Sequence, residues 1–143
     1  MTRAWIAALV LPLTACGGSD AANDPEAVNA AAQEQADRFS SGDFAGAWEM
    51  WTDDAKAAVP QEAYVEYSEA CAGTGMPLEA GQVRIEDEGE AVVRISLGKF
   101  AQSYSMAYEG DEWRWVPTDD TLDSLAEGAD AAIENATTEG TCA

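Results

Sequence analysis

The chain has 143 residues, 27 acidic side chains against 7 Lys and Arg, and no histidine. That length fits one ordinary domain, and an apolar share of 47% is enough for a core. The formal net charge of −20 excludes nucleic acid and anionic membrane surfaces as electrostatic partners, because both repel such a protein. The absence of histidine removes the commonest general base and the commonest metal ligand.

The first residues have the pattern of an export signal. Arg3 precedes an apolar run over 4–13, which is shorter than the roughly 20 residues a helix needs to span a membrane. The run leads into Leu-Thr-Ala-Cys, which ends at Cys16, and small polar residues follow. This resembles the lipobox of bacterial lipoproteins. The resemblance implies removal of signal peptide 1–15, lipidation of the Cys16 thiol, and anchoring on the extracytoplasmic face of the cell membrane. An ordinary secretory signal with an incidental cysteine is the alternative.

Composition divides the rest of the chain. Residues 16–23 carry the lipidated N-terminus and predict a flexible tether, 24–117 predict a single domain, and 118–143 predict a short helix followed by an acidic Ala/Thr-rich tail. Cys71 and Cys142 remain as an even pair in an oxidising compartment, so we expect a disulfide that fastens this tail. Two free thiols are the alternative, and the tail is close to disordered in composition unless Cys142 is bonded.

Helical spacing fills the first half of the domain. The first helix begins with an Asp-Pro-Glu signal at Asp24 and stops at Gly42. Three further helices are expected to begin near residues 43, 52 and 61, and the last ends at Cys71.

The apolar period then changes to two. Four strands are predicted over 82–86, 90–97, 100–109 and 112–117. Glycine-containing turns between them predict a register in which Val93 lies between Val83 and Tyr104, and Met106 lies opposite Trp115. The same register places Glu86 opposite Glu90. The sequence therefore predicts an α+β fold, in which helices cover the apolar face of a four-stranded antiparallel meander.

This order of elements resembles the cone-shaped nuclear transport factor 2-like (cystatin-like) fold, in which N-terminal helices wrap a bent sheet. Residues 41–48 (SGDFAGAW) are similar to the start of the second helix in that family, and 112–116 (EWRWV) to its final strand. The match covers roughly 24–117. It also resembles small lipoproteins, typical of actinobacteria, that carry such a domain. The fold hosts unrelated functions, so the resemblance implies an architecture and no particular activity.

Members of this fold often enclose a pocket between the helices and the concave sheet face. Here the candidate ligand pocket combines aromatic rings with one amide: Tyr64, Gln102, Tyr104, Met106, Tyr108, Trp113 and Trp115. Such a lining suits an apolar ligand with a few hydrogen-bonding groups. The alternative is that these rings fill the core of a small domain.

Neither catalysis nor metal binding is expected. Catalytic members of the fold use an Asp–His pair, which this chain lacks, or an Asp with a Tyr, and the strand alternation places no carboxylate on the inner face. Asp43, Asp53 and Asp54 are interpreted as helix caps. The acidic runs near 86–90 and 119–123 lack the spacing of a calcium loop, so no cofactor is expected.

The hypothesis is therefore a lipid-anchored, non-catalytic binding protein for a small apolar ligand. An accessory lipoprotein with a filled core that contacts another cell-envelope protein is the alternative.

Overall fold

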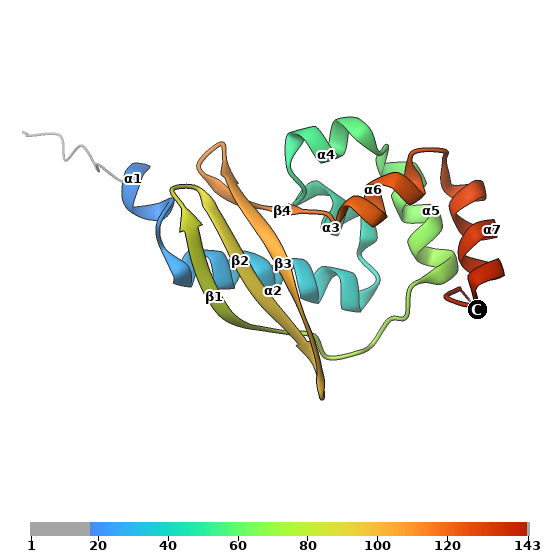
Figure 1. The fold of residues 1–143 in the computed structure, drawn as a ribbon, viewed down its shortest axis with the longest axis horizontal. Coiled ribbons are helices and arrows are strands. Elements are labelled where there is room, and N and C mark those ends of the chain that lie inside the picture. The colour runs from blue at the N-terminus through green and yellow to red at the C-terminus, as the bar shows by residue number, and fades with distance from the viewer. Residues whose placement is uncertain (1–17, 143) are drawn as a thin grey trace, which may run out of the picture.

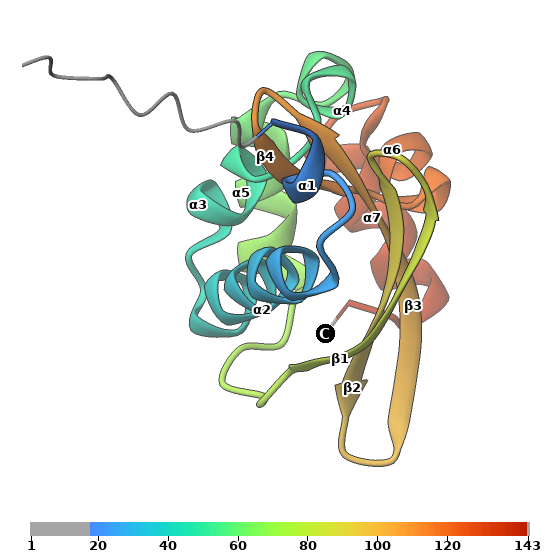
Figure 2. The same ribbon diagram turned by 90° about the vertical axis from the view of Figure 1, so that its left-hand side faces the viewer.

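A computed structural model describes residues 18–142 of the chain (Figure 1). Signal segment 1–15 and Cys16 lie outside the described residues. In chain order the elements are α1 (Gly18–Ala21), α2 (Pro25–Ser41), α3 (Phe44–Glu49), α4 (Asp53–Ala58), α5 (Gln61–Cys71), β1 (Glu79–Asp87), β2 (Glu90–Leu97), β3 (Phe100–Glu109), β4 (Glu112–Val116), α6 (Asp119–Leu125) and α7 (Ala129–Glu139). Helix α2 lies along one face of the sheet, and α4 to α7 gather at one end of the molecule (Figures 1 and 2).

Helix α2 begins and ends where the sequence predicts. The Asp24 carboxylate accepts a hydrogen bond from the Glu26 backbone N–H at 2.9 Å, with Pro25 at the first helical position. The helix ends at Gly42, whose φ of +83° is a left-handed conformation that glycine adopts without strain. These two ends fix the length of the helix that covers the sheet.

The acidic residues near the next two helix starts differ in role. Asp43 caps α3, because its carboxylate accepts from the Gly46 N–H at 3.0 Å. Asp53 and Asp54 were also expected to be caps, but Thr52 occupies that position and the two acids lie in the first turn of α4. There their charges favour the positive end of the helix dipole.

The sheet is an antiparallel meander in the order β1-β2-β3-β4, as predicted. Val93 pairs with Val83 and Tyr104, and Met106 pairs with Trp115, which confirms the register. One pairing is wrong: a bulge after Ile85 places Asp87, and not Glu86, opposite Glu90. The extra residue makes the β1–β2 turn shorter than expected, and it frees the Glu86 carboxylate to pair with Arg84.

The inner face of the sheet packs against α2. A cluster of buried apolar side chains, which we call the sheet cluster, joins the helix to the strands: Val28, Ala32, Ala91, Val93, Ile95, Met106 and Trp113. A second group of buried apolar side chains, the aromatic cluster, lies among the helices: Phe44, Ala47, Trp51, Ala55, Val59, Tyr64, Leu125 and Ala132. The domain therefore has two adjoining cores of different composition.

The segment before α2 packs on the domain and differs from the expected tether. The carbonyl of Ala21 accepts from the Trp113 indole N–H at 2.9 Å, and that of Ala22 accepts from the Gly89 N–H at 3.1 Å. Ala22 is buried. Small residues permit this close approach, so the composition that indicated flexibility also suits tight packing.

The C-terminal segment forms a helix, where the sequence predicted an acidic tail that is close to disorder unless Cys142 is bonded. Residues Ala129, Ala132 and Ala136 of α7 are buried at helical spacing. The Sγ atoms of Cys71 and Cys142 lie 1.96 Å apart, at bonding distance, as the cysteine count predicted. A bond between them ties the end of α7 to the end of α5, which gives the alanine face of α7 a surface to pack on.

Candidate ligand-binding cavity

A cavity of about 460 Å³ lies between α2, α5 and the inner face of the sheet. Its volume is within the range that holds small-molecule ligands. The lining residues come from distant parts of the chain: Gln35, Ala36, Phe39, Trp51, Tyr64, Tyr67, Ser68, Cys71, Ala72, Leu78, Ile95, Gln102, Tyr104, Trp115, Pro117, Thr118 and Thr121. They bring six aromatic rings together with several neutral polar groups.

The local periodicity of each element explains its share of the wall. On α5, Tyr64, Ser68 and Cys71 recur at helical spacing and so face the same side. On the strands, Tyr104 and Trp115 share the inner face, because side chains alternate across a sheet. A short β-bridge between Trp51 and Trp115 of β4 holds Trp51 at the cavity. In this bridge the Trp115 backbone N–H donates to the Met50 carbonyl at 2.8 Å.

Four of the seven residues in the predicted pocket line this cavity. Tyr64 is buried in its wall, Tyr104 and Trp115 are half-buried, and Gln102 is exposed at its edge. Two pairs of rings stack in the wall: the centroids of Trp51 and Tyr64 lie 4.6 Å apart, and those of Tyr104 and Trp115 lie 4.7 Å apart.

The other three predicted residues lie elsewhere. Met106 is buried in the sheet cluster. Tyr108 and Trp113 line a second hollow of about 390 Å³ beside the start of α2. Alternation correctly places all three on the inner face, but α2 crosses that face and divides it. These three residues therefore lie outside the lining of the first cavity, and the sequence does not show where the helix crosses.

The electrostatics of the cavity are those of an uncharged site. No Asp, Glu, Lys or Arg is among the described residues that line it. Burial raises the pKa of Tyr64 to about 12, and a hydrogen bond with Ser68 offsets part of that effect. Burial also raises the pKa of Tyr104. Both phenols therefore stay neutral and serve as hydrogen-bonding groups at ordinary pH.

Two functional candidates escaped the sequence reasoning. Gln35 and Trp51 are only 4% and 2% exposed, and both line the cavity. In the sequence, Gln35 and Trp51 both recur at the helical spacing of core residues, so neither stands out as a ligand-binding group. The one available signal was an amide within an apolar stripe, because a glutamine is seldom fully buried.

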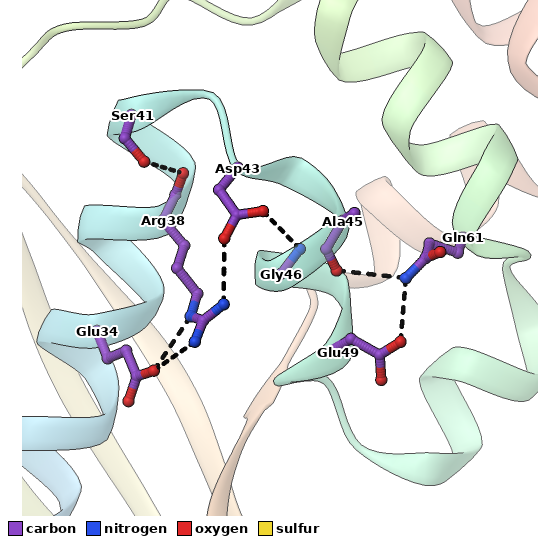
Figure 3. A network of polar contacts seen from close by, with 8 residues as sticks. All are labelled: Glu34, Arg38, Ser41, Asp43, Ala45, Gly46, Glu49 and Gln61. Atoms are coloured by element: carbon purple, nitrogen blue, oxygen red, sulfur yellow. Dashed lines mark hydrogen bonds and ion pairs between the residues drawn. The ribbon is translucent and has the colours of Figure 1, made fainter.

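A polar network fixes the corner where α2, α3 and α5 meet beside the cavity (Figure 3). The Arg38 guanidinium pairs with Glu34 at 2.7 Å and with Asp43 at 3.1 Å. The Gln61 amide donates to the Ala45 carbonyl at 3.4 Å and to the Glu49 carboxylate at 3.1 Å. These contacts are exposed, so their role is to orient helices more than to stabilise them.

Within 18–142, no three His, Cys, Asp or Glu side chains gather as a group that could hold a metal ion. Among the helices described, none is both long and apolar enough to cross a membrane. Phe100, at the start of β3, is 81% exposed.

Comparison with known proteins gives no further assignment. No protein family matches the chain, and no curated protein or solved structure is significantly similar to it.

Proposed function

We propose that the chain is a lipid-anchored extracytoplasmic protein whose domain binds a small, largely apolar ligand without transforming it. The observation that carries the binding role is the uncharged, aromatic-lined cavity of about 460 Å³. The lipobox-like Leu-Thr-Ala-Cys segment ending at Cys16 supports the anchor. The cysteine pair at bonding distance suits an oxidising compartment outside the cytosol.

The proposed architecture is that of a nuclear transport factor 2-like cone. Helices come first in the chain and pack on one face of an antiparallel meander, and the cavity lies between the two layers. The proposal of a non-catalytic role rests on the lining. The described lining residues include no carboxylate, and the chain contains no histidine to act as a general base.

Native mass spectrometry of the exported, oxidised protein tests the binding role. We expect a mass above that of the chain, which is lost on gentle activation. The variant Ala72→Phe places a ring in the cavity wall and should abolish the extra mass. The control Ala101→Phe adds the same ring at an exposed strand position and should retain it. An extra mass that survives in Ala72→Phe would place the ligand elsewhere.

The anchor is tested separately by fractionating cells that express the protein or its Cys16→Ala variant. We expect the protein in the membrane fraction, labelled by a radioactive fatty acid, and the variant without label. An unlabelled, secreted wild-type protein would contradict the anchor and leave the cavity proposal standing.

One observation favours the second function, an accessory lipoprotein that contacts another envelope protein. Phe100 is 81% exposed directly after the β2–β3 turn, and large exposed rings are common in binding hot spots. The variant Phe100→Ser should then lose a cross-linked partner that the wild-type protein captures in intact cells.

A further inference from the structure

Two residues of the cavity wall each contain a buried polar atom that has no hydrogen-bond partner among residues 18–142. The two atoms are Oε1 of Gln35, an acceptor, and Nε1 of Trp51, a donor, and they are the ones found among the described residues. Both residues line the cavity. Burying such atoms without a partner carries a full desolvation penalty, so a folded protein seldom leaves them unpaired without a reason.

The same chain satisfies comparable groups elsewhere. The Trp48 indole donates to a backbone carbonyl at 2.8 Å, and that of Trp113 at 2.9 Å. The Gln33 amide uses both of its ends, donating to a carbonyl at 3.0 Å and accepting from an N–H at 2.8 Å. Within the cavity itself, Tyr64 and Ser68 hydrogen-bond each other. Among the described residues, buried side-chain atoms without a partner are therefore confined to Gln35 and Trp51.

The surroundings exclude a charged ligand. A net charge of −20 opposes the entry of an anion. A cation would find no carboxylate among the described lining residues. A neutral molecule meets neither obstacle.

We infer that the ligand is an uncharged ring compound that carries a hydrogen-bond donor and an acceptor of the carboxamide type. This inference rests on the proposed function of the cavity. The donor of the ligand bonds to Gln35 Oε1, and its acceptor receives the Trp51 indole N–H. Because both atoms are buried, the inference requires each side chain to turn toward the cavity when the ligand binds. The aromatic lining holds the apolar body of the ligand.

Four probes with one ring system test this by isothermal titration calorimetry on the purified, oxidised protein. The probes are 2-naphthamide, 2-methylnaphthalene, 2-naphthoate and (2-naphthylmethyl)trimethylammonium. They present a neutral amide, no polar group, an anion and a cation on the same body. We expect 2-naphthamide to bind about a hundredfold more tightly than 2-methylnaphthalene, because two net hydrogen bonds are proposed and each supplies about tenfold, and we expect it to bind more tightly than either charged probe.

Variants then assign the bonds. Gln35→Met keeps the length of the side chain and removes its amide, and should weaken 2-naphthamide about tenfold while leaving 2-methylnaphthalene unchanged. Trp51→Phe removes the indole donor and part of the ring, so it should weaken 2-naphthamide about tenfold more than it weakens 2-methylnaphthalene, and it provides an independent test if Gln35→Met folds poorly. The matched control is Gln102→Met, which makes the same change at the exposed edge of the cavity and should alter neither affinity.

The outcomes separate this inference from the proposed function. Equal binding of 2-methylnaphthalene and 2-naphthamide would overturn the inference and leave an apolar binding cavity standing. Tighter binding of either charged probe would overturn it too. If no probe binds and the exported protein carries no extra mass, the cavity is not a ligand site, and both proposals fail together.

Discussion

The two cores of the domain differ in whether their buried polar groups have hydrogen-bond partners. The sheet cluster is mostly aliphatic, and its one indole, that of Trp113, donates to a carbonyl. The aromatic cluster borders a cavity of about 460 Å³ and contains Trp51, whose indole N–H has no partner among residues 18–142. A domain of this size has few interactions to spare, because folded proteins are only marginally stable. If the cavity binds a ligand as proposed, the sheet cluster supplies stability, whereas the aromatic cluster gives up some stability for binding.

The largest expected effect on the free energy of unfolding comes from removing the bond between Cys71 and Cys142, which joins α5 to the end of α7 beside the aromatic cluster. Replacing Cys71 and Cys142 together by Ser releases a covalent loop of 71 residues' separation. In the chain-entropy view, the free energy of unfolding falls by roughly 4 kcal/mol. Urea unfolding of the purified proteins measures it, and reduction of the wild-type protein with dithiothreitol is the control. A reduced protein as stable as the oxidised one would contradict the assignment.

Truncation within the sheet cluster comes next. Met106 is 1% exposed, so Met106→Ala leaves a cavity and should lower the free energy of unfolding by about 3 kcal/mol. Met76 is 41% exposed and gives the matched control: Met76→Ala should change it by less than about 0.5 kcal/mol. Similar values for the two variants in urea unfolding would mean that the sheet cluster is loosely packed.

Alkaline pH should weaken the aromatic cluster in particular. The pKa of Tyr64 is raised from 10.0 to about 12 in the folded protein. The unfolded chain therefore loses this proton first, and the stability that the neutral phenol contributes is complete below pH 10 and disappears as the pH approaches 12. Urea unfolding at a series of pH values should show a loss of roughly 2 to 3 kcal/mol over that window.

The control for this pH dependence is Tyr64→Phe. This variant should keep only the smaller slope that Tyr104 contributes, because burial raises the pKa of that phenol too. An unchanged slope in Tyr64→Phe would show that the proton is lost from another group.

The smallest expected effect is a gain in stability, opposite in sign to the losses above, and it tests the contrast between the two cores most directly. Gln35→Met removes the unpartnered amide oxygen from a site that is 4% exposed. Because a buried unpaired acceptor is costly, the ligand-free variant should be more stable than the wild-type protein by about 1 kcal/mol. Gln102→Met, at an exposed position, should be neutral. A destabilised Gln35→Met variant in thermal or urea unfolding would show that the amide supports the fold.

Much of the fold was predictable from the sequence because it is set by local signals, namely turn glycines and a helix N-cap. Turns with left-handed glycines at Gly89, Gly98 and Gly110 set the sheet, and the strong start signal at Asp24 set the first helix. The register shift that places Asp87 opposite Glu90 was missed, because the same residues are compatible with a bulge and a short turn or with a regular strand and a longer loop.

The site was less predictable because it depends on contacts between distant elements. Tyr64, Tyr104 and Trp115 were found from periodicity. Gln35 and Trp51 were not, since each follows the helical spacing of a core residue and only the folded chain reveals a missing partner. Helix α7 was missed for a related reason: its alanine face has little apolar area, and it packs only where the link to Cys71 holds it.

The bond between Cys71 and Cys142 also decides how the molecule bears mechanical load. A force applied between Gly18 and Cys142 runs through the helices to Cys71 and crosses the bond, so the sheet lies in a closed loop under no tension. That loop withholds roughly 240 Å of extension, from 71 residues' separation at about 3.4 Å each. Helix α2 lies on the loaded path and the strands on the shielded one, and the cavity lies between them. Pulling would therefore separate α2 from the sheet and open the cavity, while the loop that contains the strands carries no tension.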